Sequence, residues 1–469
     1  MAADSARSAP AALRPLYQDV ADDGSIRRFG EEIEPANPNG WPGYEDQLAA
    51  ARAATGARHA VTTGRATVAG EPCVIVGFDF GFLGGSTGVA EGARIRQAFS
   101  AAATERLPVV CIAASGGSRM QEGTSALVQM QIFAAGIAEA RRGGIPYIVV
   151  TGDPTTGGVW SSLVACADVL VGVPGARVSF SGSRTRPPGA EADSQEYLAE
   201  GKWARGFVDV LIAEAGLRAE IAAAVRLLSP RSRGTLERAP LPDWPPGADA
   251  GPAGQTAWAQ VISARSGRKD RADQWLGGYF TATLELRGDR CGGVDPGLRC
   301  GFGSHGGATI AYIAQTGEAT TAAGYRTATR LLGLAARFGL PVLTLIDTPG
   351  AAARPSDEAD GVGTAIAELY VAVAASQVPI TSVVIGEGVS GGALALASPT
   401  DLWIARPGYL AVTAPELAAS ILKLGPGDVP AVAERLRLTP AELTARGIVR
   451  GILQPAGVEP RSGQPADPR

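Results

Sequence analysis

Histidine and lysine are scarce in this chain of 469 residues. The histidines are His59 and His305, and the lysines are Lys202, Lys269 and Lys423, so arginine carries almost all of the basic charge. Histidine is the commonest metal ligand and the usual base of hydrolytic triads. Its scarcity excludes most metal centres built on histidine and restricts triad chemistry, and we expect no metal site.

Cysteine pairs and long apolar runs are also missing. None of the five cysteines belongs to a Cys-x-x-Cys pair, which argues against a structural zinc site and for reduced thiols. No run of 18 apolar residues could form a transmembrane helix. The first residues, up to about Pro15, are small and polar and lack the apolar core of a signal peptide. These features together predict a cytoplasmic protein.

Charge of one sign is not concentrated anywhere. The 42 basic and 46 acidic residues give a net charge of −4 without a block of like charge. We therefore expect neither nucleic acid nor a membrane as a partner. Hydrophobic residues make up 45% of the chain, which is enough for sizeable cores, and the length suits two domains of roughly 200 residues each.

The stretch Ala113–Gly123 places two glycines where a strand ends and a helix begins. Leu107–Ile112 before it is typical of a buried strand, and an amphipathic helix is predicted from Ser125 to about Arg141. At such a turn, backbone N–H groups lack partners and lie at the positive end of a helix dipole. The turn therefore suits a phosphate or a reaction oxyanion. The alternative is a tight turn that only needs small residues.

Features of the first half recur in the second half at a nearly constant distance along the chain. The distance from Pro108 to Pro341, which we call the repeat distance, also separates Gly117 from Gly350, Asp168 from Asp401, and the turn Pro174–Gly175 from the turn Pro407–Gly408. The glycine pairs Gly157–Gly158 and Gly391–Gly392 lie one position further apart. This self-similarity predicts two copies of one domain, and the strand–turn–helix units within each predict an α/β fold.

Composition places the domain boundaries. Residues 1–40 are aperiodic and predict a loose N-terminal arm, followed by a first domain at 41–228. Residues 229–255 are rich in proline, glycine and arginine and predict a linker, followed by a second domain at 256–469.

These motifs resemble the carboxyltransferase component of acyl-CoA carboxylases. The first half is similar to the bacterial β subunit in Phe82–Gly88, Ser115–Glu122 and Asp153–Val159. The second half is similar to the α subunit in Gly288–Arg290, Gly324–Arg326, Ile346–Gly350, Ile385–Gly388 and Ser390–Ala395. The resemblance spans about residues 41–450. It implies two tandem crotonase-like domains of ββα repeats.

The resemblance also implies a reaction. In this family a carboxyl group moves between carboxybiotin on a carrier protein and an acyl thioester, on coenzyme A or an acyl carrier. The chemistry passes through a thioester enolate and an anionic ureido oxygen of biotin, and both need N–H donors aimed at the developing charge. Family active sites form between the first half of one chain and the second half of another. A homo-oligomer is therefore implied, with a biotin carrier and a biotin carboxylase as partners.

Site residues are carried over from the family by position. The acyl oxyanion is assigned to Gly116, Gly117, Ser118, Gly157 and Gly158, and the biotin oxygen to Gly350, Gly391, Gly392 and Ala393. Contacts with the cofactor or the thioester are assigned to Gly84, Gly85, Ser86, Arg119, Tyr325, Arg326, Ala351 and Ala352.

The chain departs from the family pattern in several places. The zinc ribbon of the β subunit is missing. Ala351–Arg354 stands where the family has Ala-Tyr-Pro-Gly, and Glu358–Val362 stands where it has Glu-Glu-Arg-Gly-Gln. Trp160 replaces a small residue beside Gly157–Gly158. The sequence has no Met-Lys-Met motif for biotin attachment, so any biotin would arrive on another protein.

The sequence leaves other functions open. A biotin-independent decarboxylase, or another thioester enzyme of the same fold, would use the same enolate step. A partner subunit without catalytic activity is a further alternative. Gly388–Gly392 also matches the Gly-x-Ser-x-Gly nucleophile elbow of serine hydrolases. That class needs a histidine after the serine in chain order, and none follows His305.

Overall fold

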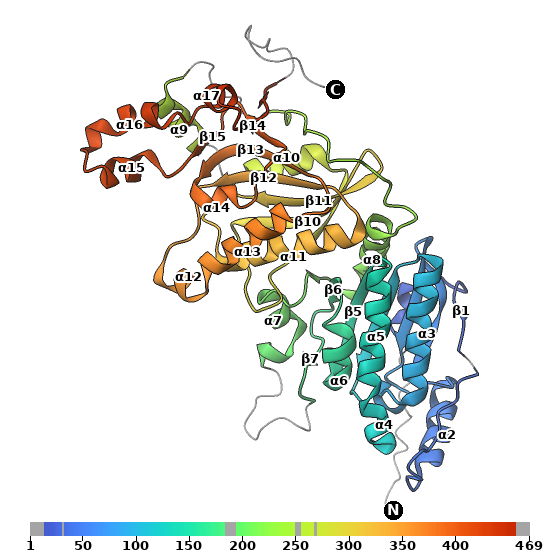
Figure 1. The fold of residues 1–469 in the computed structure, drawn as a ribbon. Coiled ribbons are helices and arrows are strands. Elements are labelled where there is room, and N and C mark those ends of the chain that lie inside the picture. The colour runs from blue at the N-terminus through green and yellow to red at the C-terminus, as the bar shows by residue number, and fades with distance from the viewer. Residues whose placement is uncertain (1–13, 31, 183–193, 249–254, 267–269, 456–469) are drawn as a thin grey trace, which may run out of the picture. The chain divides into compact units, whose positions relative to one another are not determined.

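A computed structural model describes residues 14–30, 32–182, 194–248, 255–266 and 270–455 of the chain. The chain divides into two compact units, Met1–Ser232 and Arg233–Arg469. Each unit is built around one eight-stranded sheet, coloured blue to green in the first and yellow to red in the second (Figure 1). The predicted α/β fold in two copies is confirmed.

The sheet of the first unit starts with an antiparallel hairpin and continues with parallel strands. Its order is β1 (Arg27–Arg28), β2 (Val61–Val68), β3 (Glu71–Phe78), β4 (Val109–Ser115), β5 (Tyr147–Thr156), β6 (Val169–Gly172) and β8 (Val210–Leu211), and β7 (Val178–Ser179) pairs with β5. The hairpin loop is Ala69 and Gly70, both at positive φ, as a two-residue type I′ turn requires.

The sheet of the second unit repeats this plan. Its order is β9 (Ala282–Leu286), β10 (Leu298–His305), β11 (Ala308–Gln315), β12 (Val342–Thr348), β13 (Ile380–Val389), β14 (Leu402–Ala405) and β16 (Ile452–Leu453), and β15 (Tyr409–Ala411) pairs with β13. Gly306 and Gly307, both at positive φ, close its hairpin. The later strands are again parallel.

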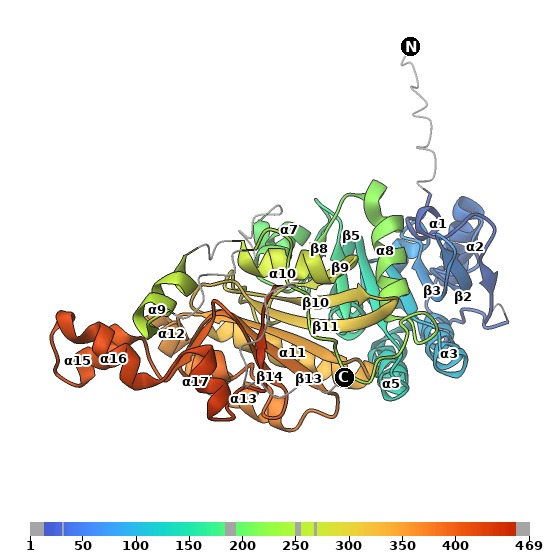
Figure 2. The same ribbon diagram turned by 90° about the horizontal axis from the view of Figure 1, so that it is seen from above.

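A pair of helices covers each sheet. In the first unit, α3 (Val89–Glu105) and α5 (Gln129–Arg142) lie side by side in both views (Figure 2). They bury an apolar core that includes Val74 and Val76 of β3. In the second unit, α11 (Ala322–Phe338) pairs with α13 (Val362–Ala374) in the same way.

The remaining helices are shorter or lie elsewhere on the units. In the first unit they are α1 (Tyr17–Val20), α2 (Tyr44–Thr55), α4 (Thr124–Leu127), α6 (Gly157–Val159), α7 (Ala199–Ala204) and α8 (Glu214–Leu228). In the second unit they are α9 (Ala257–Arg265), α10 (Arg271–Tyr279), α12 (Pro355–Ala359), α14 (Ser390–Leu394), α15 (Pro415–Ile421), α16 (Val429–Leu436) and α17 (Pro440–Ala445). None of the helices in the described ranges is long and apolar enough to span a membrane.

The repeat extends to individual residues. Strands β4 and β12, strands β5 and β13, and helices α3 and α11 form pairs of equal length, and the members of each pair start at the repeat distance. The register shifts once between β4 and β5, at Ala113–Ser115, and once between β12 and β13, at Ile346–Thr348. Pro108 and Pro341 thus precede equivalent strands, as predicted.

The first unit is slightly longer than the second between its hairpin and its first long helix. Helices α3 and α11 start at the repeat distance, whereas the hairpin strands β2 and β10 start further apart than that. The extra residues make room for a short 3₁₀ turn at Leu83–Gly85. This 3₁₀ turn lies beside the end of β4, where the first predicted glycine turn begins.

The described part of the predicted arm is not loose. Tyr17 is buried, and its hydroxyl lies 3.1 Å from Thr62 Oγ1 of β2. A Cβ atom on Gly77 of β3 would lie 2.2 Å from Tyr17 Cγ, so the ring fills the space above a glycine. β1 then pairs with β2. The arm is ordered because Tyr17 packs over Gly77 of β3 and β1 pairs with β2 as the edge strand of the sheet.

The predicted linker is also packed in its described part. Ala239 is buried in the core of the second sheet, and its carbonyl accepts a hydrogen bond from Thr381 Oγ1 at 2.9 Å. Trp244 contacts Trp275 of α10 edge to face. Residues 249–254 of the predicted linker lie outside the described ranges.

Candidate functional site: two glycine turns

The first glycine turn follows β4. Gly117 has φ +111, in the region that only glycine enters easily. Its N–H donates to Ser115 Oγ at 3.0 Å, and the N–H of Gly116 donates to the carbonyl of Gly84 at 2.9 Å. Both predicted N–H donors are therefore used inside the protein, which revises their expected part in oxyanion binding. Among the described residues, the N–H of Ser118 has no acceptor.

The start of α6 lies against this turn. A Cβ atom on Gly117 would lie 3.5 Å from Gly157 Cα and 3.6 Å from Gly158 N. The N–H of Gly157 donates to the carbonyl of Phe180 at 3.1 Å. Gly158 is the second residue of α6, where N–H groups have no intrahelical acceptor. The structure thus brings the predicted residues of the first half together and favours Ser118 and Gly158 as the N–H donors.

The second glycine turn follows β12 and repeats the first. Gly350 has φ +124, and its N–H donates to Thr348 Oγ1 at 3.2 Å. Thr320 pairs with Ala351 in a short parallel bridge, just as Thr87 pairs with Ser118. Each turn is therefore fixed by the hydroxyl that ends its strand and by one added backbone bridge.

The start of α14 corrects the predicted pairing of the glycines. Ser390, the first residue of α14, has φ +65, the same value as Gly157 at the start of α6. The structural equivalents are thus Gly157 with Ser390 and Gly158 with Gly391, each pair at the repeat distance. Pairing the two glycine doublets directly is off by one position, because a serine here adopts a backbone conformation that favours glycine.

The second turn also brings its predicted residues together. A Cβ atom on Gly392 would lie 2.5 Å from Ala351 N and 3.0 Å from Gly350 C, so α14 begins directly on the turn. The predicted contact of Ala393 with the biotin oxygen is corrected. It is the fourth residue of α14 and is fully buried, and the N–H at that position makes the first intrahelical bond. The candidate N–H donors at this turn are those of Ala351, Gly391 and Gly392.

The residues predicted to contact a cofactor in the first half hold the turn instead. Ser115 Oγ donates to the carbonyl of Gly85 at 2.7 Å, and a Cβ atom on Gly85 would lie 2.0 Å from the carbonyl oxygen of Ala114. With the bond from Gly116 to Gly84, the extra 3₁₀ turn of the first unit buttresses the glycine turn. Only glycine allows this close approach.

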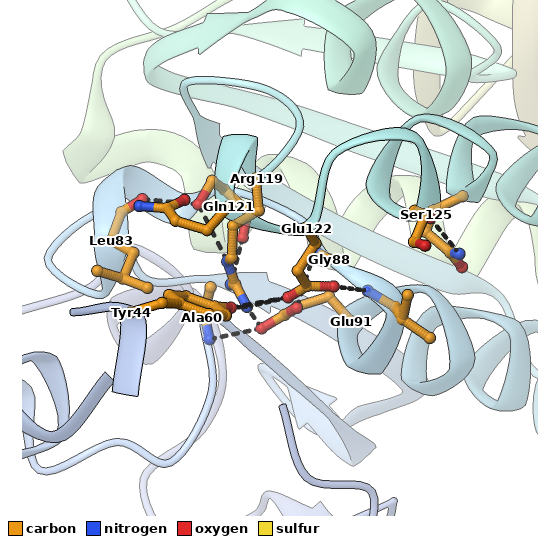
Figure 3. Close-up of polar contacts among 12 residues, drawn as sticks. Tyr44, Ala60, Leu83, Gly88, Glu91, Arg119, Gln121, Glu122 and Ser125 are labelled. Carbon is orange, nitrogen blue, oxygen red and sulfur yellow. Dashed lines mark hydrogen bonds and ion pairs between the residues drawn. The ribbon is translucent and has the colours of Figure 1, made fainter. Parts of the chain in front are cut away.

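Arg119 lies in a buried polar network, shown in Figure 3. Its guanidinium donates to Glu91 Oε1 at 2.8 Å, to Glu122 Oε1 at 3.2 Å, to Tyr44 Oη at 3.2 Å and to the carbonyl of Ser86 at 2.6 Å. The side chain has no exposed surface. Arg119 therefore supports the turn that precedes it, which corrects its predicted contact with a cofactor.

Charge pairing with Arg119 keeps the Glu91 carboxyl ionised. Burial by itself would raise the pKa of the Glu91 carboxyl, but the Arg119 guanidinium and its hydrogen bonds hold the pKa below the ordinary value. Burial raises the pKa of Tyr44 well above its ordinary value, so its hydroxyl stays protonated and donates to Glu122 Oε1 at 2.8 Å.

Of the residues of the second half that were predicted to contact the cofactor, three lie at the second turn and one is partly exposed and paired with a carboxylate. The Tyr325 side chain is buried, and its hydroxyl donates to the carbonyl of Gly392 at 3.2 Å. Ala351 and Ala352 form the second turn itself. Arg326, by contrast, is about one-third exposed and pairs with Asp289 at 2.7 Å.

Several residues that hold the two turns were not predicted as site residues from the sequence. Ser115 and Thr348 could have been found, because both carry a hydroxyl two positions before a glycine and they are separated by the repeat distance. Tyr44, Gln315 and Tyr370 could not, because their contacts with the turns cross long stretches of chain.

Both halves of the chain match models of carboxyltransferase families. Residues 36–186 match the carboxyl transferase domain, and residues 253–468 match the acetyl co-enzyme A carboxylase carboxyltransferase-like family. The acetyl-coenzyme A carboxylase carboxyl transferase subunits beta/alpha of Saccharopolyspora erythraea are 36% identical, over 94% of this chain and 80% of that protein. A probable biotin-dependent acyl-coenzyme A carboxylase beta3 subunit of Mycobacterium bovis is 32% identical, over 93% and 88%.

Solved structures agree on the fold. Transcarboxylase 12S, in a structure with hydrolysed methylmalonyl-coenzyme A bound, matches with a TM-score of 0.75 at 20% identity, over 94% of this chain and 86% of that one. The fold and the paired turns define a carboxyltransferase with tandem crotonase-like domains. The chain belongs to the family of acetyl-CoA carboxylase carboxyltransferases, as a single chain that joins the β-like and α-like parts.

Proposed function

We propose that this chain transfers a carboxyl group between carboxybiotin, held on a separate carrier protein, and a coenzyme A thioester. The observation that carries the proposal is the repetition of one arrangement of N–H donors in both units. Each unit presents the N–H after a glycine turn beside the N–H groups that open a short helix. Such preorganised donors stabilise charge that develops during a reaction.

We assign the first turn to the acyl thioester. Removing or adding a carboxyl group at the carbon next to a thioester places negative charge on the thioester oxygen. The N–H groups of Ser118 and Gly158 are suited to receive that oxygen, because the turn carries no bulky side chain and Ser118 is partly exposed. No side-chain nucleophile is required for this step.

We assign the second turn to the ureido group of biotin. Biotin, when bound, supplies or accepts the carboxyl group on a ureido nitrogen. The residues at the turn fit such a group, because Ala351 and Gly391 are partly exposed and present at most a methyl group beside their N–H donors. The relative from Mycobacterium bovis is named as biotin-dependent, and the lack of a Met-Lys-Met motif supports a separate carrier.

The proposal is tested with the purified full chain and biocytin, a small biotin derivative that replaces the carrier. Malonyl-CoA and methylmalonyl-CoA are supplied in parallel as carboxyl donors. We expect the carboxylated thioester to be consumed at a rate that depends on biocytin. Equal consumption without biocytin would instead indicate a biotin-independent decarboxylase. No consumption of any carboxylated thioester would favour a partner subunit without catalysis.

Assembly and location are part of the same proposal. We propose a homo-oligomer that works with a biotin carrier and a biotin carboxylase. The structure of transcarboxylase 12S describes a hexamer, which supports an assembly of this kind. None of the five cysteines forms a disulfide, which supports the reducing environment of the cytoplasm.

A further inference from the structure

Three side chains from three elements converge on the second glycine turn. Tyr370 of α13 donates from its hydroxyl to the carbonyl of Gly391 at 3.0 Å. Tyr325 of α11 and Gln315 of β11 both donate to the carbonyl of Gly392, each at 3.2 Å. We call Gln315, Tyr325 and Tyr370 the carbonyl clamp.

Two members of the clamp, Tyr325 and Gln315, replace a donor that the helix does not provide. Within an α-helix the carbonyl of Gly392 would accept the N–H of Leu396. That N–H instead donates to the carbonyl of Ala393, at 3.3 Å. Gly392 therefore takes its hydrogen bonds from Tyr325 and Gln315, so its carbonyl direction is set by elements outside α14.

The amide of Gln315 can face the turn in only one way. A carbonyl oxygen accepts and cannot donate, so Nε2 of Gln315 must point toward Gly392. Gln315 is fully buried, and its Oε1 has no hydrogen-bond partner in the described part of the chain. A buried amide oxygen without a partner is costly. Gln315 thus donates an N–H to the turn although its own amide oxygen stays without a hydrogen bond in the described part of the chain.

Holding these carbonyls also fixes N–H groups. A peptide unit is planar and trans, so the direction of the Gly391 carbonyl determines the direction of the Gly392 N–H. A hydrogen bond to the carbonyl also polarises the peptide and strengthens its N–H as a donor. The Gly391 carbonyl also accepts the Ala395 N–H at 2.9 Å, so Tyr370 adds a second hydrogen bond to it. Tyr370 therefore acts on the Gly392 N–H, which has no acceptor in the α-helical pattern because Gly392 is the third residue of α14.

The first unit has a counterpart at the equivalent position. The hydroxyl of Ser162 donates to the carbonyl of Gly158 at 2.6 Å, and that of Ser161 at 3.3 Å. Gly158 is the equivalent of Gly391, so both units place a hydroxyl donor on the same carbonyl. In the first unit the donors lie in the helical segment Trp160–Val164, which follows α6 directly, whereas in the second unit the donor comes from α13.

We propose that Gln315, Tyr325 and Tyr370 are positioning residues for the biotin site. Tyr370 sets the direction of the Gly392 N–H toward the ureido oxygen. Tyr325 and Gln315 hold the next peptide, on the other side of the Gly392 Cα, and so fix the residue that carries this N–H. The inference rests on the proposed function and names the residues that set its second turn. Burial raises the pKa of both phenols, so both hydroxyls stay protonated at neutral pH and keep donating.

The test uses the full-length chain, biocytin and the better carboxyl donor of malonyl-CoA and methylmalonyl-CoA. Tyr370→Phe removes one hydrogen bond without changing the ring. We expect kcat/KM for biocytin to fall about fivefold, the usual effect of one net hydrogen bond, while KM for the acyl-CoA stays unchanged. The double variant Tyr325→Phe/Tyr370→Phe should lose more, with the loss again confined to biocytin.

Tyr279→Phe is the matched control. Tyr279 is a buried tyrosine of the same unit, and its hydroxyl donates to the carbonyl of Pro240 at 2.8 Å, not to a glycine turn. Its removal should leave kcat/KM for biocytin unchanged, whatever it does to the melting temperature.

Two results would overturn the inference in different ways. If the wild-type protein transfers its carboxyl group to biocytin and the double variant does so equally well, the clamp does not position the donors. The same holds if both substrates are affected equally and the melting temperature falls, because the clamp is then only structural. If the wild-type protein shows no dependence on biocytin, the proposed function fails and the inference fails with it.

Discussion

At the scale of single residues, a substitution of Gly117 tests the assignment of the first turn to the acyl thioester. A Cβ atom there would touch Gly157 and Gly158 at 3.5–3.6 Å without a severe clash, but φ +111 strains any other residue. The strain should displace the neighbouring Ser118 N–H. We therefore expect Gly117→Val to lower the rate of the acyl reaction about a hundredfold, the effect of losing one oxyanion donor. The measurement is the rate of acyl-CoA turnover with circular dichroism to check the fold.

Gly175→Val is the control for backbone strain. Gly175 also has positive φ, +79, and a Cβ atom on it would have no other atom within 4 Å. It should retain near-normal turnover at a comparable conformational cost. Loss of activity in both variants to the same degree would remove the support for a special function of the first turn.

The second turn needs a different substitution from the obvious one. On Gly392 a Cβ atom would lie 2.5 Å from the backbone N of Ala351, so any side chain there displaces the turn. On Gly391 it would meet only Tyr370 Oη, at 3.4 Å. We expect Gly391→Ala to keep the fold and to lower transfer to biocytin about tenfold, since a methyl group then lies beside the donors. Unchanged kinetics for biocytin would contradict the assignment of this turn.

At the scale of elements, the sequence could predict those features that depend on a local pattern of residues. The strand before each turn, the glycines and the repeat distance are all encoded within short segments, and these suffice to locate both turns. The conformation of Ser390 could not be predicted, because a serine at positive φ carries no glycine signal. The use of the Gly116 and Gly117 N–H groups was equally hidden, since it depends on the distant Gly84 carbonyl and on the Ser115 rotamer.

The packing of the N-terminal arm, which precedes the first domain, leads to a prediction about stability. Tyr17 is buried against Gly77, although the sequence around it shows no periodicity. Replacing a buried aromatic residue with alanine typically costs about 3–5 kcal/mol. We expect Tyr17→Ala to lower the free energy of unfolding of the first unit by about 3 kcal/mol, measured by urea titration. A change below about 0.5 kcal/mol, typical of surface sites, would show that the segment contributes no packing.

At the scale of the whole molecule, the proposed assembly is open to direct measurement. The family resemblance implies that a complete site needs two chains, so an isolated chain should be inactive. We expect sedimentation at micromolar concentration to show a dimer or a larger species, not a monomer of 47.8 kDa. A fully active monomer would exclude this assembly.

A charged network supports the first turn and a neutral clamp supports the second, so the KM values of the two substrates should depend on pH differently. The pKa of Glu91 is lowered, so its support for the first turn is complete above the ordinary carboxyl pKa and is lost as pH falls through the lowered value. The pKa values of Tyr325 and Tyr370 are raised, so their support for the second turn is complete below the ordinary tyrosine pKa and is lost as pH rises through the raised values. Acid should therefore raise KM for the acyl-CoA before it raises KM for biocytin, because the first turn is supported by a carboxylate and the clamp at the second turn is neutral. From neutral to mildly alkaline pH, KM for biocytin should stay constant, because burial keeps both phenols protonated. A titration of both constants would show that the two substrates of one enzyme differ in their sensitivity to pH.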